Sequence, residues 1–192
     1  MRIIRFIRVN RGFTLIELMV VIAIVGILAT IGVPAMRDTI ERNAVSGHVN
    51  TFIASLRFAR SEAIKSGMSV VMCRSENPEN AAPKCAAGSG TLGWASGWIV
   101  FVNRDANANN NFNSAAGDSL LKAQGGLVNS GGIEKTSGSA VNKFVFRPTG
   151  LLSAGASSFA FNAKSLSSDQ QRFMCISMQG RARISLNEVT DC

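Results

Sequence analysis

The longest apolar stretch of the chain lies near its amino terminus. Residues 13–33, FTLIELMVVIAIVGILATIGV, carry a single ionisable side chain, that of Glu17. Because about 20 apolar residues are enough for an α-helix to cross the hydrocarbon core of a bilayer, this stretch predicts a membrane-spanning helix. A carboxylate is costly in that environment unless a cation pairs with it, so Glu17 predicts a specific positively charged partner.

The next stretch continues the helical spacing but adds a polar face. Between residues 34 and 66 the apolar residues at helical spacing are Met36, Ile40, Val45, Val49, Phe52, Ile53, Leu56, Ala59, Ala63 and Ile64. Gly67 is a suitable residue to cap the carboxyl end. The pattern predicts one helix over residues 13–66, with a membrane-spanning half at 13–33 and an amphipathic half at 34–66 that packs on a head domain.

Residues 67–192 show short apolar runs separated by Gly, Asn and Ser, which is typical of strands joined by loops. The expected strands cover residues 70–73, 98–102, 143–147, 158–162, 172–178 and 181–186. Two long stretches between them, the Asn-rich 103–118 and the Gly/Ser-rich 125–142, predict exposed loops. This part of the chain is therefore expected to form one β-rich head domain.

The last two expected strands form a hairpin whose register decides which residues share a face. A two-residue turn at 179–180 would place the arginines that follow it beside Met178 and Ile176. A three-residue turn at 178–180, with Gly180 in the left-handed conformation, separates apolar from charged residues instead. It groups Met174, Ile176, Ala182, Ile184 and Leu186 on one face and Cys175, Ser177, Arg181 and Arg183 on the other. We expect the second register because of this separation.

The net charge of the chain is weaker evidence for an anionic ligand than its size suggests. The chain has 20 Lys and Arg against 12 Asp and Glu, a formal charge of +8. Four of the arginines lie in residues 1–12, before the apolar stretch, and without them the charge falls to +4. Arginines on the cytoplasmic side of a membrane helix follow the positive-inside bias, so half of the excess charge is no argument for a ligand.

The four cysteines, Cys73, Cys85, Cys175 and Cys192, have no C-x-x-C spacing, and the single histidine, His48, is distant in sequence. This pattern disfavours a metal site. An even number of cysteines behind a membrane-targeting segment indicates disulfides made in an oxidising compartment. Three pairings are possible. We favour Cys73 with Cys85 and Cys175 with Cys192, which close short loops, while the crossed pairings stay open.

The segment Gly12-Phe13-Thr14-Leu15-Ile16-Glu17 resembles the prepilin peptidase motif of type IV pilins and type II secretion pseudopilins. The resemblance implies a leader, residues 1–12, that is cut off after Gly12, and methylation of the new amino group of Phe13. It also implies an assembly role for Glu17, whose carboxylate could pair with the amine of a neighbouring subunit. An ordinary secretory signal sequence, cut near Ala35, is disfavoured by the length of the apolar run and by Glu17.

Three further segments are similar to the GspH/FimT branch of minor pilins: Ala59-Arg60-Ser61-Glu62-Ala63, Gly97-Trp98-Ile99-Val100-Phe101 and Phe146-Arg147-Pro148-Thr149-Gly150. The resemblance implies an α+β fold in which the long helix packs on two small antiparallel sheets. Arg60 and Glu62 are interpreted as a solvated helix end and Trp98 as a core residue, with no ligand implied.

The same resemblance predicts the function and location of the protein. It implies a minor pilin that takes part in pilus initiation or tip assembly, with other major and minor pilins and the prepilin peptidase as partners. The alternative is a GspH-like pseudopilin of a type II secretion system. The protein would lie in the inner membrane with its head in the periplasm, and in an extracellular pilus after assembly. Nothing in the sequence indicates an enzyme or a cofactor.

Residues 180–183, Gly-Arg-Ala-Arg, are similar to the G-R-x-R segment by which some FimT-like minor pilins bind DNA during natural transformation. Two arginines on one strand face suit phosphates, because guanidinium groups stay charged and can make bidentate contacts. Arg181 and Arg183 are therefore candidates for binding double-stranded DNA without sequence specificity, and Arg172 would widen the patch. The alternative is a solvated strand face.

Overall fold

The computed structural model describes residues 12–105, 111–138, 142–153, 156–165, 171–188 and 192. All of the expected leader except Gly12 lies outside these residues. One helix, α1 (Leu15–Ser66), begins two residues after the predicted start and ends at the predicted residue. The chain divides into two compact units, Met1–Thr39 and Ile40–Cys192.

In the first unit, α1 carries the apolar stretch with its side chains exposed. One 18-residue window has a mean hydropathy of 2.6, and none of it is buried. Phe13, Leu15 and Ile16 are 90%, 76% and 70% exposed, and the exposed apolar side chains continue to Val33. An apolar surface of this kind is stable only in lipid or against other apolar helices, which agrees with a membrane or filament-core segment.

In the second unit, one stripe of α1 is buried against the strands. The buried residues Val45, Val49, Phe52, Leu56, Ala59 and Ala63 follow one another at alternating intervals of four and three residues. That spacing keeps all six side chains on one face of a helix. The helix ends at Gly67, whose φ of 65° is left-handed and whose N–H donates to the carbonyl of Ala63 at 3.1 Å. The expected amphipathic half and its cap are thus present.

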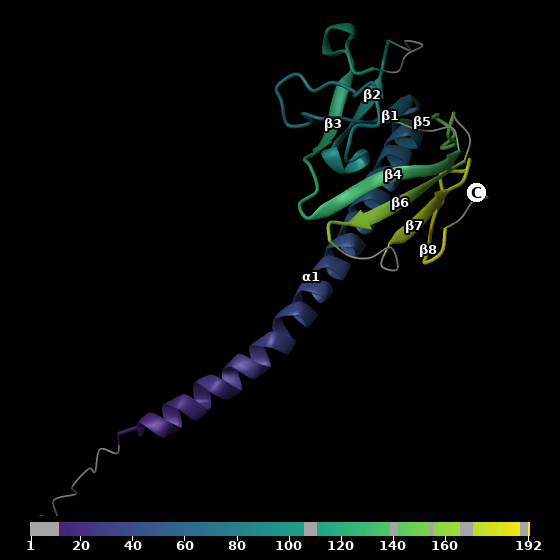
Figure 1. Cartoon of the computed structure of the whole chain (residues 1–192). Coiled ribbons are helices and arrows are strands. Elements are labelled where there is room, and N and C mark those ends of the chain that lie inside the picture. The colour runs from purple at the N-terminus through teal and green to yellow at the C-terminus, as the bar shows by residue number, and fades with distance from the viewer. Residues whose placement is uncertain (1–11, 106–110, 139–141, 154–155, 166–170, 189–191) are drawn as a thin grey trace, which may run out of the picture. The chain divides into compact units, whose positions relative to one another are not determined.

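Two four-stranded antiparallel sheets pack on this part of α1 (Figure 1). The first has the order β3-β2-β1-β5 and the second the order β4-β6-β7-β8. The strands of the first sheet are β1 (Ser69–Arg74), β2 (Trp98–Asn103), β3 (Ser119–Gln124) and β5 (Lys143–Phe146). Those of the second are β4 (Ser130–Gly138), β6 (Ser157–Ala163), β7 (Arg172–Ile176) and β8 (Ala182–Ser185), and two short 3-10 helices are η1 (Trp94–Ser96) and η2 (Ser114–Ala116). The predicted α+β class is confirmed.

Phe52 lies at the centre of the core between helix and sheets. Its ring centroid is 5.3 Å from that of Trp94, 5.2 Å from that of Trp98 and 5.7 Å from that of Phe161, all near edge-to-face. Trp98 is fully buried, as the sequence indicates. Aromatic pairs at these distances stabilise a core beyond the area they bury. They hold α1, η1 and both sheets in one arrangement.

Two strands of the structure are absent from the sequence-based expectation. The Gly/Ser-rich stretch 125–142 was expected to be an exposed loop, and this is wrong, because β4 runs through it and Ile133 is fully buried. A Cβ on Gly131 would lie 2.2 Å from the carbonyl oxygen of Ala163 on β6. Glycine is therefore required where the two strands approach, so a composition typical of loops here belongs to a strand. The strand β3 was also missed.

The Asn-rich stretch 103–118 differs from a fully exposed loop at both ends. Asn103 belongs to β2 and is buried. Asp118 is also buried, and its carboxylate accepts hydrogen bonds from the backbone N–H groups of Arg104 at 2.8 Å and Asn113 at 2.9 Å. These bonds close the connection between β2 and β3, although residues 106–110 lie outside the described part of the chain.

The register of the β7–β8 hairpin is the one that separates apolar from charged residues. Cys175 pairs with Arg183 and Ile176 with Ala182, and the N–H of Ser177 donates to the carbonyl of Arg181 at 2.9 Å, which leaves the three-residue turn 178–180. Gly180 has a φ of 71°, and its N–H donates to the carbonyl of Ser177 at 2.8 Å. The preferred register is confirmed, with Arg183 on the face of Cys175 and Ala182 on the opposite face.

Candidate functional site

The first candidate site is the start of α1, where Thr14 and Glu17 form a capping box. The backbone N–H of Thr14 donates to Oε2 of Glu17 at 3.2 Å, and the backbone N–H of Glu17 donates to Oγ1 of Thr14 at 3.3 Å. The hydroxyl of Thr14 also donates to Oε2 of Glu17 at 3.2 Å. These bonds satisfy N–H groups that a helix start leaves without intrahelical partners, and they place the carboxylate at the positive end of the helix dipole.

The residues next to this helix start are exposed and have no role in packing. A Cβ on Gly12 would meet nothing within 4 Å, and Phe13 is 90% exposed. Neither space nor backbone conformation therefore requires a glycine at position 12.

The two disulfides of the structure are Cys73–Cys85 and Cys175–Cys192, the pairs that the sequence analysis favours. In each, the Cα atoms are 5.5 Å apart. Because Cys175 pairs in register with Arg183, the second disulfide ties the carboxyl terminus to the face of the hairpin that carries the arginines. The disulfides therefore brace the loop after β1 and the last hairpin.

Arg74, beside the first disulfide, is a buried arginine that the sequence analysis did not single out. It is 2% exposed, and its guanidinium donates to the carbonyl of Gly88 at 2.8 Å, to Oγ of Ser96 at 2.9 Å and to Oε1 of Glu76 at 3.1 Å. Each side of the guanidinium is thus satisfied, by Glu76 inside the loop that Cys73–Cys85 closes and by Gly88 and Ser96 in the segment that follows that loop. The role of Arg74 is to hold that loop, and no sequence motif marks it.

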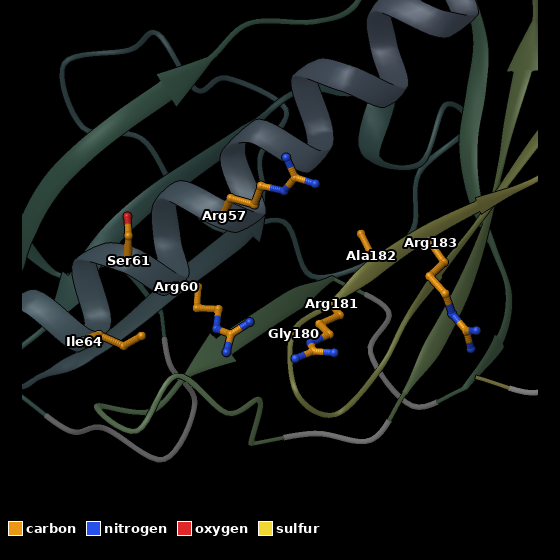
Figure 2. Close-up of a pocket in the computed structure, with 8 residues that line it drawn as sticks. All are labelled: Arg57, Arg60, Ser61, Ile64, Gly180, Arg181, Ala182 and Arg183. Carbon is orange, nitrogen blue, oxygen red and sulfur yellow. The ribbon is translucent and has the colours of Figure 1, made fainter.

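The second candidate site is a cleft of about 630 Å³ between α1 and the β7–β8 hairpin. The residues lining it are Arg57, Arg60, Ser61 and Ile64 of α1 and Gly180, Arg181, Ala182 and Arg183 of the hairpin (Figure 2). Four of the eight are arginines. We call these eight residues the arginine cleft.

The arginine cleft forms where three segments distant in sequence meet. A Cβ on Gly180 would lie 3.4 Å from Cδ of Arg60 and 2.9 Å from Cε1 of Phe146. A Cβ on Gly150 would lie 3.2 Å from Nε of Arg60. The backbone N–H of Leu152 donates to the carbonyl of Met178 at 3.0 Å, which joins the loop at Gly150 to the hairpin turn. The two glycines leave room for the side chain of Arg60, so it is half-buried and not the solvated helix end that the sequence indicated.

The charges in this cleft are all positive. Among the residues that the structure describes, no carboxylate lies within 4.0 Å of a guanidinium nitrogen of Arg57, Arg60, Arg181 or Arg183. The nearby Glu62 instead pairs with Lys65 at 3.5 Å. Like charges that gather without counter-charges create a positive potential, which attracts anions.

The structure does not bring Arg172 into this group. Arg172 pairs with Phe161 on β6, and along β7 it alternates with Cys175 so that it faces the side of Phe161 and Met174. Its Nη1 donates to the carbonyl of Gln171 at 3.3 Å. Arg172 therefore lies on the opposite face of the sheet from Arg181 and Arg183. The prediction that Arg172 widens the patch of these two arginines is wrong.

His48 is a packing residue. It is 9% exposed, and its Nε2 lies 3.1 Å from the carbonyl oxygen of Val128. Burial lowers the pKa of His48 below its ordinary value, and the hydrogen bond to Val128 opposes this only in part. Within the described residues there is no group of three or more His, Cys, Asp or Glu side chains that could hold a metal ion.

Comparison with known families gives two matches. Residues 48–180 match the family described as type II transport protein GspH, and residues 7–33 match the prokaryotic N-terminal methylation motif. The first covers most of the head and the amphipathic half of α1. The second covers the apolar stretch and the end of the segment before it.

Known relatives are similar over part of the chain. A fimbrial protein of Pseudomonas aeruginosa is 42% identical over 64 residues, 33% of this chain and 41% of the relative. Fimbrial protein EcpC of Eikenella corrodens is 56% identical over 43 residues, 22% of this chain and 28% of the relative. Prepilin peptidase-dependent protein D of Escherichia coli is 51% identical over 44 residues, 23% and 30% of the two chains. The chain thus spans less than half the length of these relatives.

Among solved structures, the type IV minor pilin FimU of Pseudomonas aeruginosa strain PAO1 has a similar fold. The TM-score is 0.53 with 19% identity, over 76% of this chain and 90% of that one. At this identity the likeness establishes the fold alone.

Proposed function

Because the chain belongs to the GspH family of type IV minor pilins and pseudopilins, we propose that it is a minor pilin that takes part in initiating a type IV pilus or assembling its tip. The observation that carries this proposal is the methylation motif at residues 7–33, joined to a helix whose apolar side chains are exposed. Family members of this kind are structural subunits, and a structural role needs no catalytic group.

Processing is the first step of the proposed function. The prepilin peptidase removes residues 1–12 and the amino group of Phe13 is then methylated. The open surroundings of Gly12, where a Cβ would meet no atom of the described residues within 4 Å, support this step, because a peptidase needs access to the bond that it cuts. Exposure of Phe13 supports it as well, since a peptidase must reach the bond between the two residues.

Assembly through α1 is the second step. Before assembly the protein lies in the inner membrane with its head in the periplasm, where the disulfides can form. The carboxylate of Glu17 rests in the capping box with Thr14 until it pairs with the methylated amine of a neighbouring pilin. The capping bonds reduce the cost of holding a carboxylate in lipid, and the charge pair replaces them in the filament core.

The test of this proposal is whether the chain serves a type IV pilus or the pseudopilus of a type II secretion system. Deleting the gene in the organism that encodes it should abolish or reduce surface pili and leave type II secretion unchanged, with recovery when the gene is restored. Loss of secretion with normal pili would assign the chain to the alternative, a GspH-like pseudopilin. Restoring the gene with Gly12→Glu tests processing, because this variant should accumulate with its leader attached.

A second candidate function is capture of double-stranded DNA, without sequence specificity, for uptake in natural transformation. The observation that favours it is the confirmed hairpin register, which puts Arg181 and Arg183 on one face, both exposed. The test is DNA binding by the full-length chain in neutral phosphatidylcholine nanodiscs. Arg181→Gln with Arg183→Gln should weaken binding and lower its salt dependence. Unchanged binding by that variant would remove the second candidate and leave the first intact.

A further inference from the structure

The arginine cleft holds two arginines that no sequence motif connects with binding, Arg57 and Arg60 of α1. They are three residues apart, so they lie about 4.5 Å apart along the helix axis and on neighbouring positions of one helix surface. Arg57 is exposed and Arg60 half-buried. In Figure 2 the side chain of Arg60 extends from the helix toward Gly180 and Arg181, whereas that of Arg57 runs along the helix.

The hairpin arginines Arg181 and Arg183 lie at the edge of the second sheet that β8 forms. β8 is the last strand of its sheet, so its outer edge is not covered by another strand. Ala182 packs against the core, while Arg181 and Arg183 lie on the opposite face, and Arg183 points away from the helix (Figure 2). An edge strand also presents backbone N–H groups outward. Positive groups therefore flank the edge of β8 on two sides, with Ala182 and Gly180 between them.

This arrangement suits one long polyanion better than a single small anion. A small anion needs donors that converge on one point, whereas these arginines follow an edge and point in different directions. A nucleic-acid backbone carries a charge at every nucleotide and can contact both sides of the edge. The eight residues include no aromatic side chain, so base stacking and sequence readout are not expected.

We propose that Arg57 and Arg60 form the second half of a phosphodiester-binding cleft, in which a nucleic-acid backbone crosses the edge of β8 between the α1 arginines and the hairpin arginines. This inference rests on the proposed capture of DNA and adds two binding residues to it. The absence of nearby carboxylates on all four arginines, among the described residues, leaves their guanidinium groups available to phosphates.

The experiment measures binding of a labelled DNA duplex to the full-length chain in neutral phosphatidylcholine nanodiscs over a range of salt concentrations. The variants are Arg57→Gln, Arg57→Gln with Arg60→Gln, and a charge-matched control, Lys84→Gln with Lys164→Gln. Both control lysines are exposed and lie outside the arginine cleft. Because Arg57 is exposed, its single replacement leaves packing intact and keeps the test valid if the double variant is unstable.

The expected result is a fall in the slope of log affinity against log salt of about 1 for Arg57→Gln and about 2 for the double variant, since each lost phosphate contact removes about one released counterion. The control pair should keep the wild-type slope. Slopes of both α1 variants equal to that of the control would overturn the inference, and the DNA function would stand if Arg181→Gln with Arg183→Gln still lowers the slope. A wild-type chain that binds no duplex, or that binds heparin in preference to it, would overturn both.

Discussion

Replacing Gly180 by alanine tests whether this one residue sets the hairpin turn and the shape of the arginine cleft. Gly180 has a φ of 71°, a left-handed conformation that costs a residue with a Cβ about 1–2 kcal/mol. The added methyl group would also lie 2.9 Å from Cε1 of Phe146, a buried ring that cannot move freely. Overpacking of this kind costs about 1–3 kcal/mol. Gly180→Ala should therefore lower the free energy of unfolding of the head by about 2–5 kcal/mol.

Gly47 provides a matched control for the same chemical change. It lies in α1 in the same compact unit, has no positive φ, and a Cβ there would meet nothing within 4 Å. Alanine is preferred to glycine within a helix by about 0.8–1 kcal/mol, so Gly47→Ala should stabilise the head. Two glycine-to-alanine changes are thus expected to shift stability in opposite directions.

Intrinsic tryptophan fluorescence is the assay, because Trp94 and Trp98 are the two tryptophans of the chain and both are buried in the core of the head. The full-length chain in nanodiscs is heated or titrated with urea. For a unit of this size, Gly180→Ala should lower the melting temperature by roughly 5–15 °C and Gly47→Ala should raise it by a few degrees. Equal stability of Gly180→Ala and the wild type would refute the account of the turn.

Three further predictions concern other parts of the molecule. Glu17→Ala and Glu17→Gln should both insert into the membrane but enter filaments poorly. The amide of Glu17→Gln can still accept the capping bond from Thr14, so incorporation of this variant at the wild-type level would show that charge pairing is not needed. Because burial lowers the pKa of His48, the unfolded chain binds more protons than the folded chain just below pH 6.5, so the head should lose stability as the pH falls through this region. His48→Gln should remove this pH dependence from denaturation curves measured on either side of pH 6.5. A variant with the pH profile of the wild type would contradict this prediction. Arg74→Leu should destabilise the head by about 1–3 kcal/mol, since it removes three hydrogen bonds that a buried guanidinium donates to Gly88, Ser96 and Glu76, and a melting temperature equal to that of wild type would count against this role.

The sequence predicts the features of this fold that depend on local patterns. The alternation of four- and three-residue intervals from Val45 to Ala63 identifies the buried stripe of α1 without any tertiary information. The hairpin register follows from keeping Arg183 and Ala182 on separate faces. Each of these predictions uses residues within a few turns or one hairpin of one another, where the periodicity itself carries the information.

Features that depend on distant segments could not be predicted in the same way. The glycines of β4 are typical of loops and therefore predict a loop, although Gly131 is there to let the backbone of β6 approach. Arg60 was interpreted as part of a solvated helix end, because its contact with the segments around Gly150 and Gly180 exists only in the folded head. The similarity of all three segments to one family was the available signal that they share a site.

The measurement that tests the central proposal most directly is the mass of the intact chain isolated from assembled surface filaments, together with sequencing of its amino-terminal peptide. The account predicts a chain that begins at methylated Phe13 and retains both disulfides. A chain in filaments that still begins at Met1, or one cut near Ala35, would contradict it.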